Sequence, residues 1–143
     1  IAKNKHLKII TSKKLRERYY GKYEGKSVKQ FQSDLKDVFQ KMKTMSDEQI
    51  RSFRRYEGFE TDEELVSKFS VYLKRITKQH KGKTILVASH GSLMRVFLIH
   101  LRFAKYRELS PVSIENTGFI KLMSDGNNFY LKEVKGIHKT VVY

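Results

Sequence analysis

The chain of 143 residues has no cysteine and no tryptophan, a single proline (Pro111), and half as many acidic as basic residues. The absence of cysteine excludes a disulfide scaffold, a thiolate metal site and a cysteine nucleophile. No Gly/Ser-rich linker, low-complexity tract or repeat divides the sequence, so we expect one domain over residues 1–143. The apolar runs, such as Thr84 to Ala88, are too short to span a bilayer, and no signal peptide is recognisable. The sequence therefore predicts a cytoplasmic protein without a membrane partner.

The shortage of acidic residues leaves a formal net charge of +15 and a pI near 10.0. A basic surface attracts phosphorylated partners, from small phosphate esters to nucleic acids. The lysines are spread along the chain, as in the stretches 3–14, 36–43 and 74–83, so they can equally form a solvated surface that binds nothing. The charge alone does not decide between these readings, and we consider a nucleic acid an improbable partner. Hydrophobic residues make up 39% and aromatic residues 12%, which indicates a packed interior and not a disordered chain.

The spacing of apolar residues predicts strands that alternate with helices. Leu7–Thr11 and Thr84–Ala88 are short apolar runs of the kind found within a parallel sheet. Periodic apolar positions predict helices over residues 27–42, 61–80 and 93–101. Ser27 is a candidate N-cap, and Thr61 with Glu64 has the pattern of a capping box. The polar stretch 44–58 is expected to be a short helix that acts as a flap.

The last third of the chain predicts a β-hairpin. Phe119–Met123 and Phe129–Val134 flank an Asp-Gly-Asn-Asn turn, with Phe129, Leu131 and Glu133 facing away from the alternate residues Tyr130, Lys132 and Val134. Taken with the alternating strands and helices, this favours an α/β fold, a three-layer sandwich with a mostly parallel sheet.

In such a sheet, functional groups gather where a strand turns into a helix. Ser89-His90-Gly91-Ser92 lies between a predicted strand and a predicted helix, so free backbone N–H groups at the helix start would favour a bound anion. Gly91 would permit a ligand to approach the backbone closely. The alternative is a capping Ser89 beside a structural His90, and a lone histidine does not separate the two.

A second such turn is Leu15-Arg16-Glu17-Arg18-Tyr19-Tyr20-Gly21, which follows the run Leu7–Thr11. Glu17 is a candidate proton donor, and Arg18 and Tyr20 are candidate ligands for phosphate oxygens. Taken alone, this segment could be a charged surface loop. Periodicity and spacing thus indicate only an anion-binding α/β domain with one His and one Glu of interest.

Four segments together resemble the histidine phosphatase superfamily, which has a phosphoglycerate mutase-like fold. Residues 15–25 resemble its Glu-containing signature, and Ser89-His90-Gly91 followed by Arg95 resembles its last signature, (S/T)-H-G-G-x-x-R. Phe59-Glu60-Thr61-Asp62 is similar to the Gly-Glu-Ser element before a helix, and Ile114-Glu115-Asn116-Thr117 is similar to the Asn-containing strand that follows. The four segments occur in the family's order and cover nearly the whole chain. Ser92 stands where a second glycine is common.

The resemblance implies a phosphatase that forms a phosphohistidine and needs no metal or cofactor. It implies that Glu17 protonates the leaving oxygen and then activates water, and that His90 donates hydrogen bonds to the phosphoryl oxygens. Arg18, Tyr20, Gly91 and Ser92 would line the phosphate site, and the partner would be a small phosphorylated substrate.

The family's Arg-His-Gly motif, which carries the attacking histidine, does not occur in this sequence. Residues 1–4 resemble the end of the family's second helix, so we expect an N-terminally incomplete domain that lacks the first strand and helices and is inactive by itself. The interval of 73 residues between Glu17 and His90 is short for a mutase, which favours a phosphatase. A cofactor-dependent phosphoglycerate mutase and a non-catalytic binder of phospho-ligands or nucleic acid stay open as alternatives.

Overall fold

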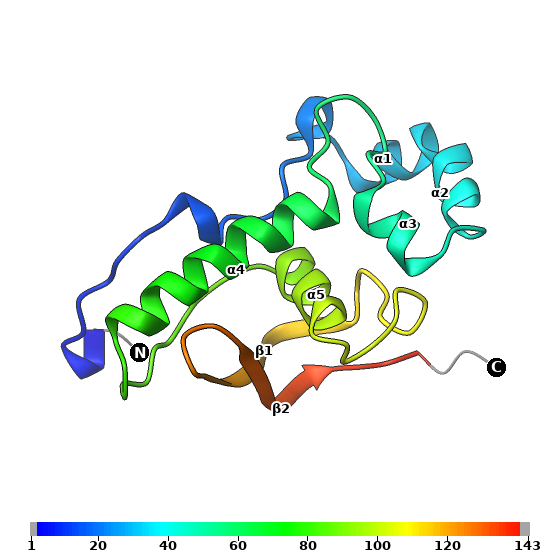
Figure 1. Cartoon of the computed structure of the whole chain (residues 1–143). Helices are drawn as coiled ribbons and strands as arrows, with labels where there is room; N and C mark the ends of the chain where they lie inside the picture. The colour runs from blue at the N-terminus through cyan, green and yellow to red at the C-terminus, as the bar shows by residue number, and fades with distance from the viewer. Residues whose placement is uncertain (1–2, 141–143) are drawn as a thin grey trace.

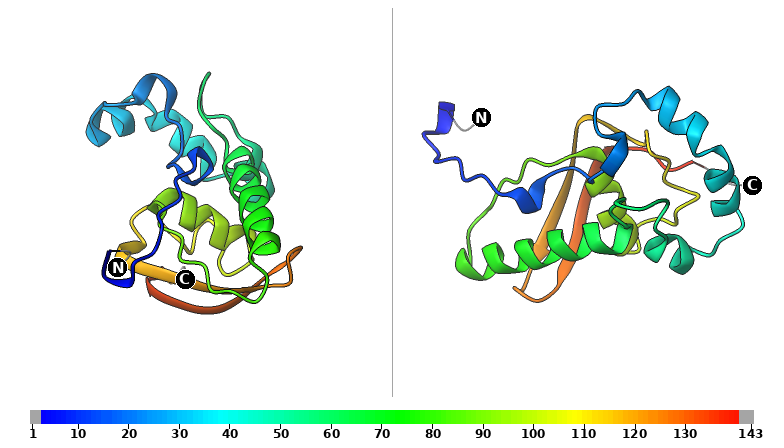
Figure 2. Two further views of the ribbon diagram at one scale, coloured as in Figure 1. Left: turned by 90° about the vertical axis from the view of Figure 1, so that its left-hand side faces the viewer. Right: turned by 90° about the horizontal axis from the view of Figure 1, so that it is seen from above.

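The structure is a computed structural model that describes residues 3–140. Two helices, α4 (Asp62–Gln79) and α5 (Gly91–His100), lie on one face of an antiparallel hairpin of β1 (Ile114–Ser124) and β2 (Phe129–Ile137). Three short helices form a separate group at one end of this arrangement, as Figures 1 and 2 show. They are α1 (Val28–Asp34), α2 (Lys36–Met42) and α3 (Asp47–Ser52). Single 3-10 turns occur at Lys3–Lys5, Lys13–Leu15 and Gly21–Tyr23.

The long helix α4 forms where the capping box predicts it. The Thr61 side chain accepts a hydrogen bond from the Glu64 backbone N–H, and the Glu64 carboxylate accepts one from the Thr61 N–H. One stripe of the helix is buried against α5, and Phe69 meets Phe97 edge to face with the ring centroids 5.0 Å apart. The buried residues of this core are Leu65, Val66, Phe69, Leu73, Leu93, Val96 and Phe97.

A second cluster joins the end of α5 to the inner face of the hairpin. Leu98, Ala104 and Leu109 are buried against partly buried residues of both strands, Ile120, Leu131, Val134 and Ile137. Gly118 faces the opposite strand so closely that a Cβ atom there would lie 2.8 Å from the Gly136 carbonyl oxygen, so the two strands cross where neither can carry a side chain. The predicted hairpin is confirmed: β1 begins five residues earlier and ends one residue later than expected, whereas β2 starts at Phe129 as expected and ends three residues later. The alternation of inward and outward side chains along β2 shifts where the register of the two strands breaks. Val134, and not Glu133, therefore shares the inner face with Phe129 and Leu131, and Glu133 is exposed.

The expected parallel sheet is wrong for the residues that the structure describes, whose only sheet is the two-stranded antiparallel hairpin. Leu7–Thr11 and Thr84–Ala88 are extended but form no ladder, and none of their backbone groups bonds to another segment within residues 3–140. Ile9, Ile10 and Leu86 are accordingly 73%, 67% and 71% exposed. A strand in a parallel sheet needs a neighbouring backbone to satisfy its N–H and C=O groups, and among the described residues no backbone pairs with either segment.

Two further expectations are corrected in part. The helix predicted over residues 27–42 is split into α1 and α2 at Leu35, the one residue of this stretch that is buried. Of the segment compared with the end of a helix, Lys3 and Asn4 belong to a 3-10 turn, and Ile1 and Ala2 lie outside the described residues. The predicted short helix within 44–58 is present as α3, and the helices over 61–80 and 93–101 are present as α4 and α5.

Candidate functional site

The two loops that carry Glu17 and His90 are in contact. The Ser89 hydroxyl donates to the Leu15 carbonyl oxygen at 3.3 Å, which holds the second loop beside the first. The Glu17 carboxylate accepts the backbone N–H of Ser92 through Oε2 at 3.1 Å and the N–H of Arg18 through Oε1 at 2.7 Å. Glu17 and Ser92 are 75 positions apart in the sequence. The structure therefore brings together the two turns that the sequence singled out, although no parallel sheet lies beneath them in the part of the chain that the structure describes.

The Glu17 carboxylate occupies the anion position at the start of α5. His90 is the residue before the first turn of this helix, where unpaired N–H groups carry partial positive charge. The His90 side chain is exposed and makes no capping bond. A Cβ atom at Gly91 would meet no atom within 4 Å. Space is therefore open beside the imidazole and over the backbone of Gly91.

Tyr20 lines the same region. Its hydroxyl lies 3.3 Å from the Ser92 hydroxyl, and its ring packs edge-on against Phe31 and Phe59. The loop turns sharply after it at Gly21, where φ is +52° and a Cβ atom would lie 3.0 Å from the Gly58 carbonyl oxygen. Only glycine fits a left-handed conformation so close to another backbone.

Arg18 does not face the open space beside His90. Its side chain is 3% exposed, it forms an ion pair with Asp62 and it donates to the Glu60 carbonyl oxygen at 2.6 Å. Its guanidinium also lies 5.0 Å from the centre of the Phe59 ring. These contacts anchor the Glu17 loop to the start of α4.

Two further arginines gather near this ion pair, and neither was singled out as a ligand from the sequence. The Arg55 guanidinium lies 4.8 Å from the centre of the Phe59 ring, the ring that Arg18 also contacts. Arg95 donates from Nε to the Leu109 carbonyl oxygen at 2.5 Å and from a terminal nitrogen to the Tyr106 carbonyl oxygen at 3.3 Å. Arg95 was visible as the last residue of the His90 signature, whereas Arg55 carries no sequence signal that separates it from its neighbour Arg54.

Burial shapes the electrostatics of this cluster. Desolvation lowers the pKa of both Arg55 and Arg95, and the nearby Asp62 carboxylate opposes that change. Burial, followed by the charge of Asp62, raises the pKa of the Tyr106 hydroxyl above its usual range. The Asp62 charge therefore acts on Arg55, Arg95 and Tyr106 as well as on Arg18, its partner in the ion pair.

The remaining histidines belong to other parts of the molecule. His80 ends α4, His100 stacks on Phe97, and His138 pairs with Glu115 at 2.7 Å, while His6 follows the first 3-10 turn. Within residues 3–140, no second histidine lies in the two loops that carry Glu17 and His90. The same residues contain no cluster of three or more His, Asp or Glu side chains placed to hold a metal ion.

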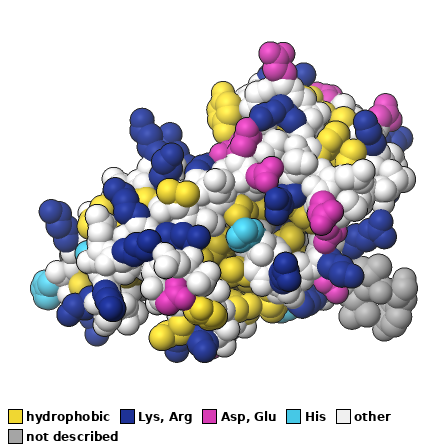
Figure 3. Space-filling view, in the orientation of Figure 1, with side chains coloured by type: hydrophobic (Ala, Val, Ile, Leu, Met, Phe, Trp, Pro, Cys, Tyr) yellow, Lys and Arg dark blue, Asp and Glu magenta, His cyan; other side chains and the backbone are white. Residues whose placement is uncertain are grey.

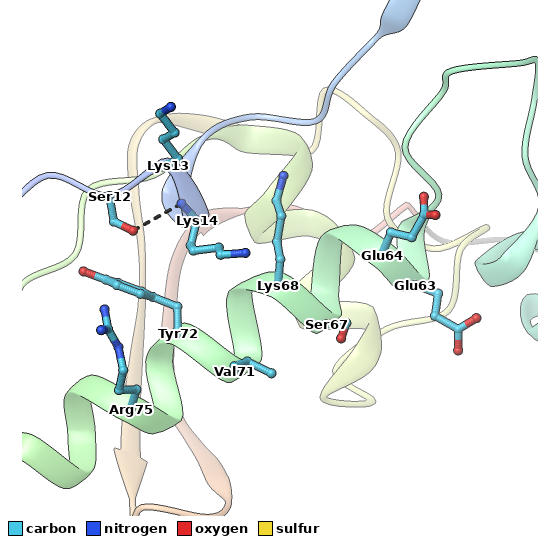
Figure 4. Close-up of a pocket in the computed structure, with 10 residues that line it drawn as sticks. All are labelled: Ser12, Lys13, Lys14, Glu63, Glu64, Ser67, Lys68, Val71, Tyr72 and Arg75. Atoms are coloured by element: carbon cyan, nitrogen blue, oxygen red, sulfur yellow. Dashed lines mark hydrogen bonds between the residues drawn. The ribbon is translucent and has the colours of Figure 1, made fainter.

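A groove of about 830 Å³ lies elsewhere on the molecule, between the 3-10 turn at 13–15 and the outer face of α4 (Figure 4). Lys13, Lys14, Lys68 and Arg75 surround it, with Tyr72 and the exposed Val71 beneath. None of the site residues predicted from the sequence lines this groove. Dark-blue basic side chains are spread over this face of the molecule in Figure 3, with fewer carboxylates among them.

The sequence pattern of the histidine phosphatase superfamily (branch 1) matches residues 1–136. The chain belongs to the histidine phosphatase superfamily. The match spans both loops that meet at Glu17 and Ser92, so the family likeness and the contact concern the same residues. No curated protein matches the chain. Among residues 3–140, this member of the superfamily has no helix both long and apolar enough to cross a bilayer.

Proposed function

We propose that this chain supplies the acid and the anion-stabilising groups of a metal-independent phosphomonoesterase that acts on a small phosphorylated substrate. The observation that supports the proposal is the contact between the Glu17 carboxylate and the Ser92 N–H at 3.1 Å. It sets a carboxyl group beside the first turn of α5, with the exposed His90 imidazole next to it. A proton donor and an anion-binding helix start are two of the features that cleavage of a phosphate ester uses.

The reaction proceeds in two displacements. A histidine nitrogen attacks phosphorus while the bond to the ester oxygen breaks, and Glu17 gives its proton to the departing alkoxide. The Glu17 carboxylate then takes a proton from water as the water oxygen attacks phosphorus. The phosphorus–nitrogen bond breaks, and inorganic phosphate leaves. In both steps His90 and the Tyr20 hydroxyl donate to the phosphoryl oxygens, and the positive charges of Arg55 and Arg95 favour the anion.

The attacking histidine belongs, in this proposal, to a further segment that carries the Arg-His-Gly motif. Exposed apolar side chains support the presence of such a segment. Leu7, Ile9, Ile10 and Leu86 are each more than half exposed on two extended segments whose backbones are unpaired within residues 3–140. A strand placed between the two segments would satisfy their hydrogen bonds and would end beside Glu17 and His90.

We propose a phosphatase, which transfers the phosphoryl group to water, and not a mutase, which transfers it to another substrate. The segment between Glu17 and His90 contains only short helices before α4, whereas a mutase would need a larger insertion to enclose a sugar acid. A non-catalytic phospho-ligand binder would keep the cationic cluster but not turn over its ligand. Formation of a phosphorylated acid product without release of phosphate would favour the mutase instead.

The first test compares this chain with the longer protein that includes the further segment. We expect the longer protein to hydrolyse 4-nitrophenyl phosphate with EDTA present and the chain from Ile1 to lack this activity, because loss of a covalent nucleophile costs several orders of magnitude. Activity that disappears in EDTA and returns with a divalent metal would overturn the proposal. Full activity of the chain by itself would overturn the assignment of the nucleophile.

The second test addresses the proton donor. In the longer protein, Glu17→Gln should slow an alkyl phosphate far more than 4-nitrophenyl phosphate, because a nitrophenolate leaves readily without a proton. Glu24→Gln is the matched control, since Glu24 lies in the same loop and its carboxylate accepts the Tyr20 N–H at 2.7 Å. Equal losses on both substrates with Glu17→Gln would make Glu17 a binding residue and not the acid.

A further inference from the structure

A buried carboxylate lies at the centre of the cationic cluster. Asp62 is 2% exposed and is the first residue of α4. Its Oδ1 pairs with Arg18, its Oδ2 is buried, and the carboxylate also interacts with the Tyr106 hydroxyl, whose pKa it helps to raise. A charge buried this deeply is costly unless its surroundings compensate it, so the neighbours of Asp62 matter beyond Arg18.

The surroundings of Asp62 are strongly positive. Arg18 and Arg55 both lie within about 5 Å of the centre of the same Phe59 ring, at 5.0 and 4.8 Å. Arg95 lies over Tyr106 at 5.5 Å, and the charge of Asp62 acts on both Arg95 and Tyr106. Three guanidinium groups and one carboxylate leave two net positive charges in this cluster. The Arg55 guanidinium lies over the Phe59 and Phe39 rings, at 4.8 and 5.6 Å, and within residues 3–140 it forms neither an ion pair nor a hydrogen bond, so its N–H groups remain available to a ligand.

We propose that Asp62 is the internal counter-ion of this arginine cluster and that it limits the affinity of the site for inorganic phosphate. The inference rests on the proposed function, in which phosphate is the product. With Asp62 in place, the cluster has a net charge of +2 and attracts the phosphate dianion. Without the Asp62 charge, the net charge of the cluster would be +3. Phosphate would then be bound more tightly, and the product would leave more slowly. Asp62 acts through Arg18, Arg55 and Arg95 and does not itself touch phosphate, so it is a positioning residue.

The test measures binding of inorganic phosphate by titration calorimetry at constant ionic strength. Asp62→Asn keeps the size of the side chain and an oxygen for Arg18 but removes the charge. We expect this variant to bind phosphate about tenfold more tightly than the unchanged chain. A change of this order in affinity is what the loss of one nearby negative charge produces in a partly solvated site. Asp62→Glu, which restores the charge, should return the affinity toward that of the unchanged chain.

Glu63→Gln is the matched control. Glu63 is the next residue of α4, and the substitution changes the net charge equally, but its carboxylate pairs with Arg51 at the surface, where both side chains are about half exposed. We expect phosphate affinity to be unchanged there. Equal gains for Asp62→Asn and Glu63→Gln would reflect overall charge alone and overturn the proposal.

Circular dichroism establishes that each variant is folded before titration, and Asp62→Ser offers a second way to remove the charge at a helix start. If neither variant folds, Asp62 is a structural anchor and the proposal is overturned. Phosphate that binds the unchanged chain and Asp62→Asn equally would overturn this inference and leave the proposed function standing. Phosphate that binds neither protein would count against both.

Discussion

The ion pair between Arg18 and Asp62 should be among the most sensitive points of the fold. Both side chains are 3% exposed, so Arg18→Met would leave the buried Asp62 charge without the guanidinium that pairs with it directly. Breaking a buried pair in this way costs about 3–5 kcal/mol. The lost hydrogen bond to the Glu60 carbonyl oxygen and the lost contact with Phe59 place the expected value near the top of that range. At roughly 4 °C per kcal/mol for a chain of this size, the Tm should fall by about 15–20 °C.

The assay is urea unfolding followed by circular dichroism, with Arg51→Met as the control. Arg51 makes the same kind of contact with Glu63 at 2.9 Å, but its side chain is 51% exposed, so its loss should cost no more than about 0.5 kcal/mol. The double variant Arg18→Met/Asp62→Leu should recover part of the lost stability, because it removes the unpaired charge. Similar costs for Arg18→Met and Arg51→Met would refute the reasoning that burial makes this pair strong.

Three other substitutions test separate features. Thr61→Ala should lower the free energy of unfolding by about 1 kcal/mol through loss of the α4 cap, and recovery by Thr61→Ser in the same urea titration would assign the loss to the hydroxyl. Burial raises the pKa of Tyr56 to about 12, so its contribution to stability is complete below pH 10 and is lost as the pH rises toward 12; Tyr56→Phe, which lacks the hydroxyl that donates to Tyr20, should show a weaker fall in stability over that window. Gly118→Ala should destabilise the hairpin by more than about 1 kcal/mol, because its Cβ would meet backbone oxygens of the opposite strand, and an unchanged Tm would contradict the close crossing.

Local features of the fold could be read from the sequence because each depends on residues a few positions apart. The capping box of Thr61 and Glu64 is present, and the turn at Asp125 forms with its carboxylate accepting the N–H groups of Asn127 and Asn128. The proximity of Glu17 and His90 was also predictable, because each follows a predicted strand and each lies in a family signature, although the two stretches taken separately were compatible with a surface loop and a structural histidine.

Other contacts between distant segments were decided by the tertiary structure alone. Leu7–Thr11 and Thr84–Ala88 have the composition of buried strands, yet a strand exists only where another backbone pairs with it, and within residues 3–140 none does. Arg18 was expected at the phosphate, but the start of α4 brings Asp62 to it from 44 positions away and buries both. Sequence alone determined which residues could cap, turn or bind an anion. The packing of the chain decided which charges pair with each other and which remain available to a ligand. The reason is that the energy of a charged group depends on its burial and on its neighbours.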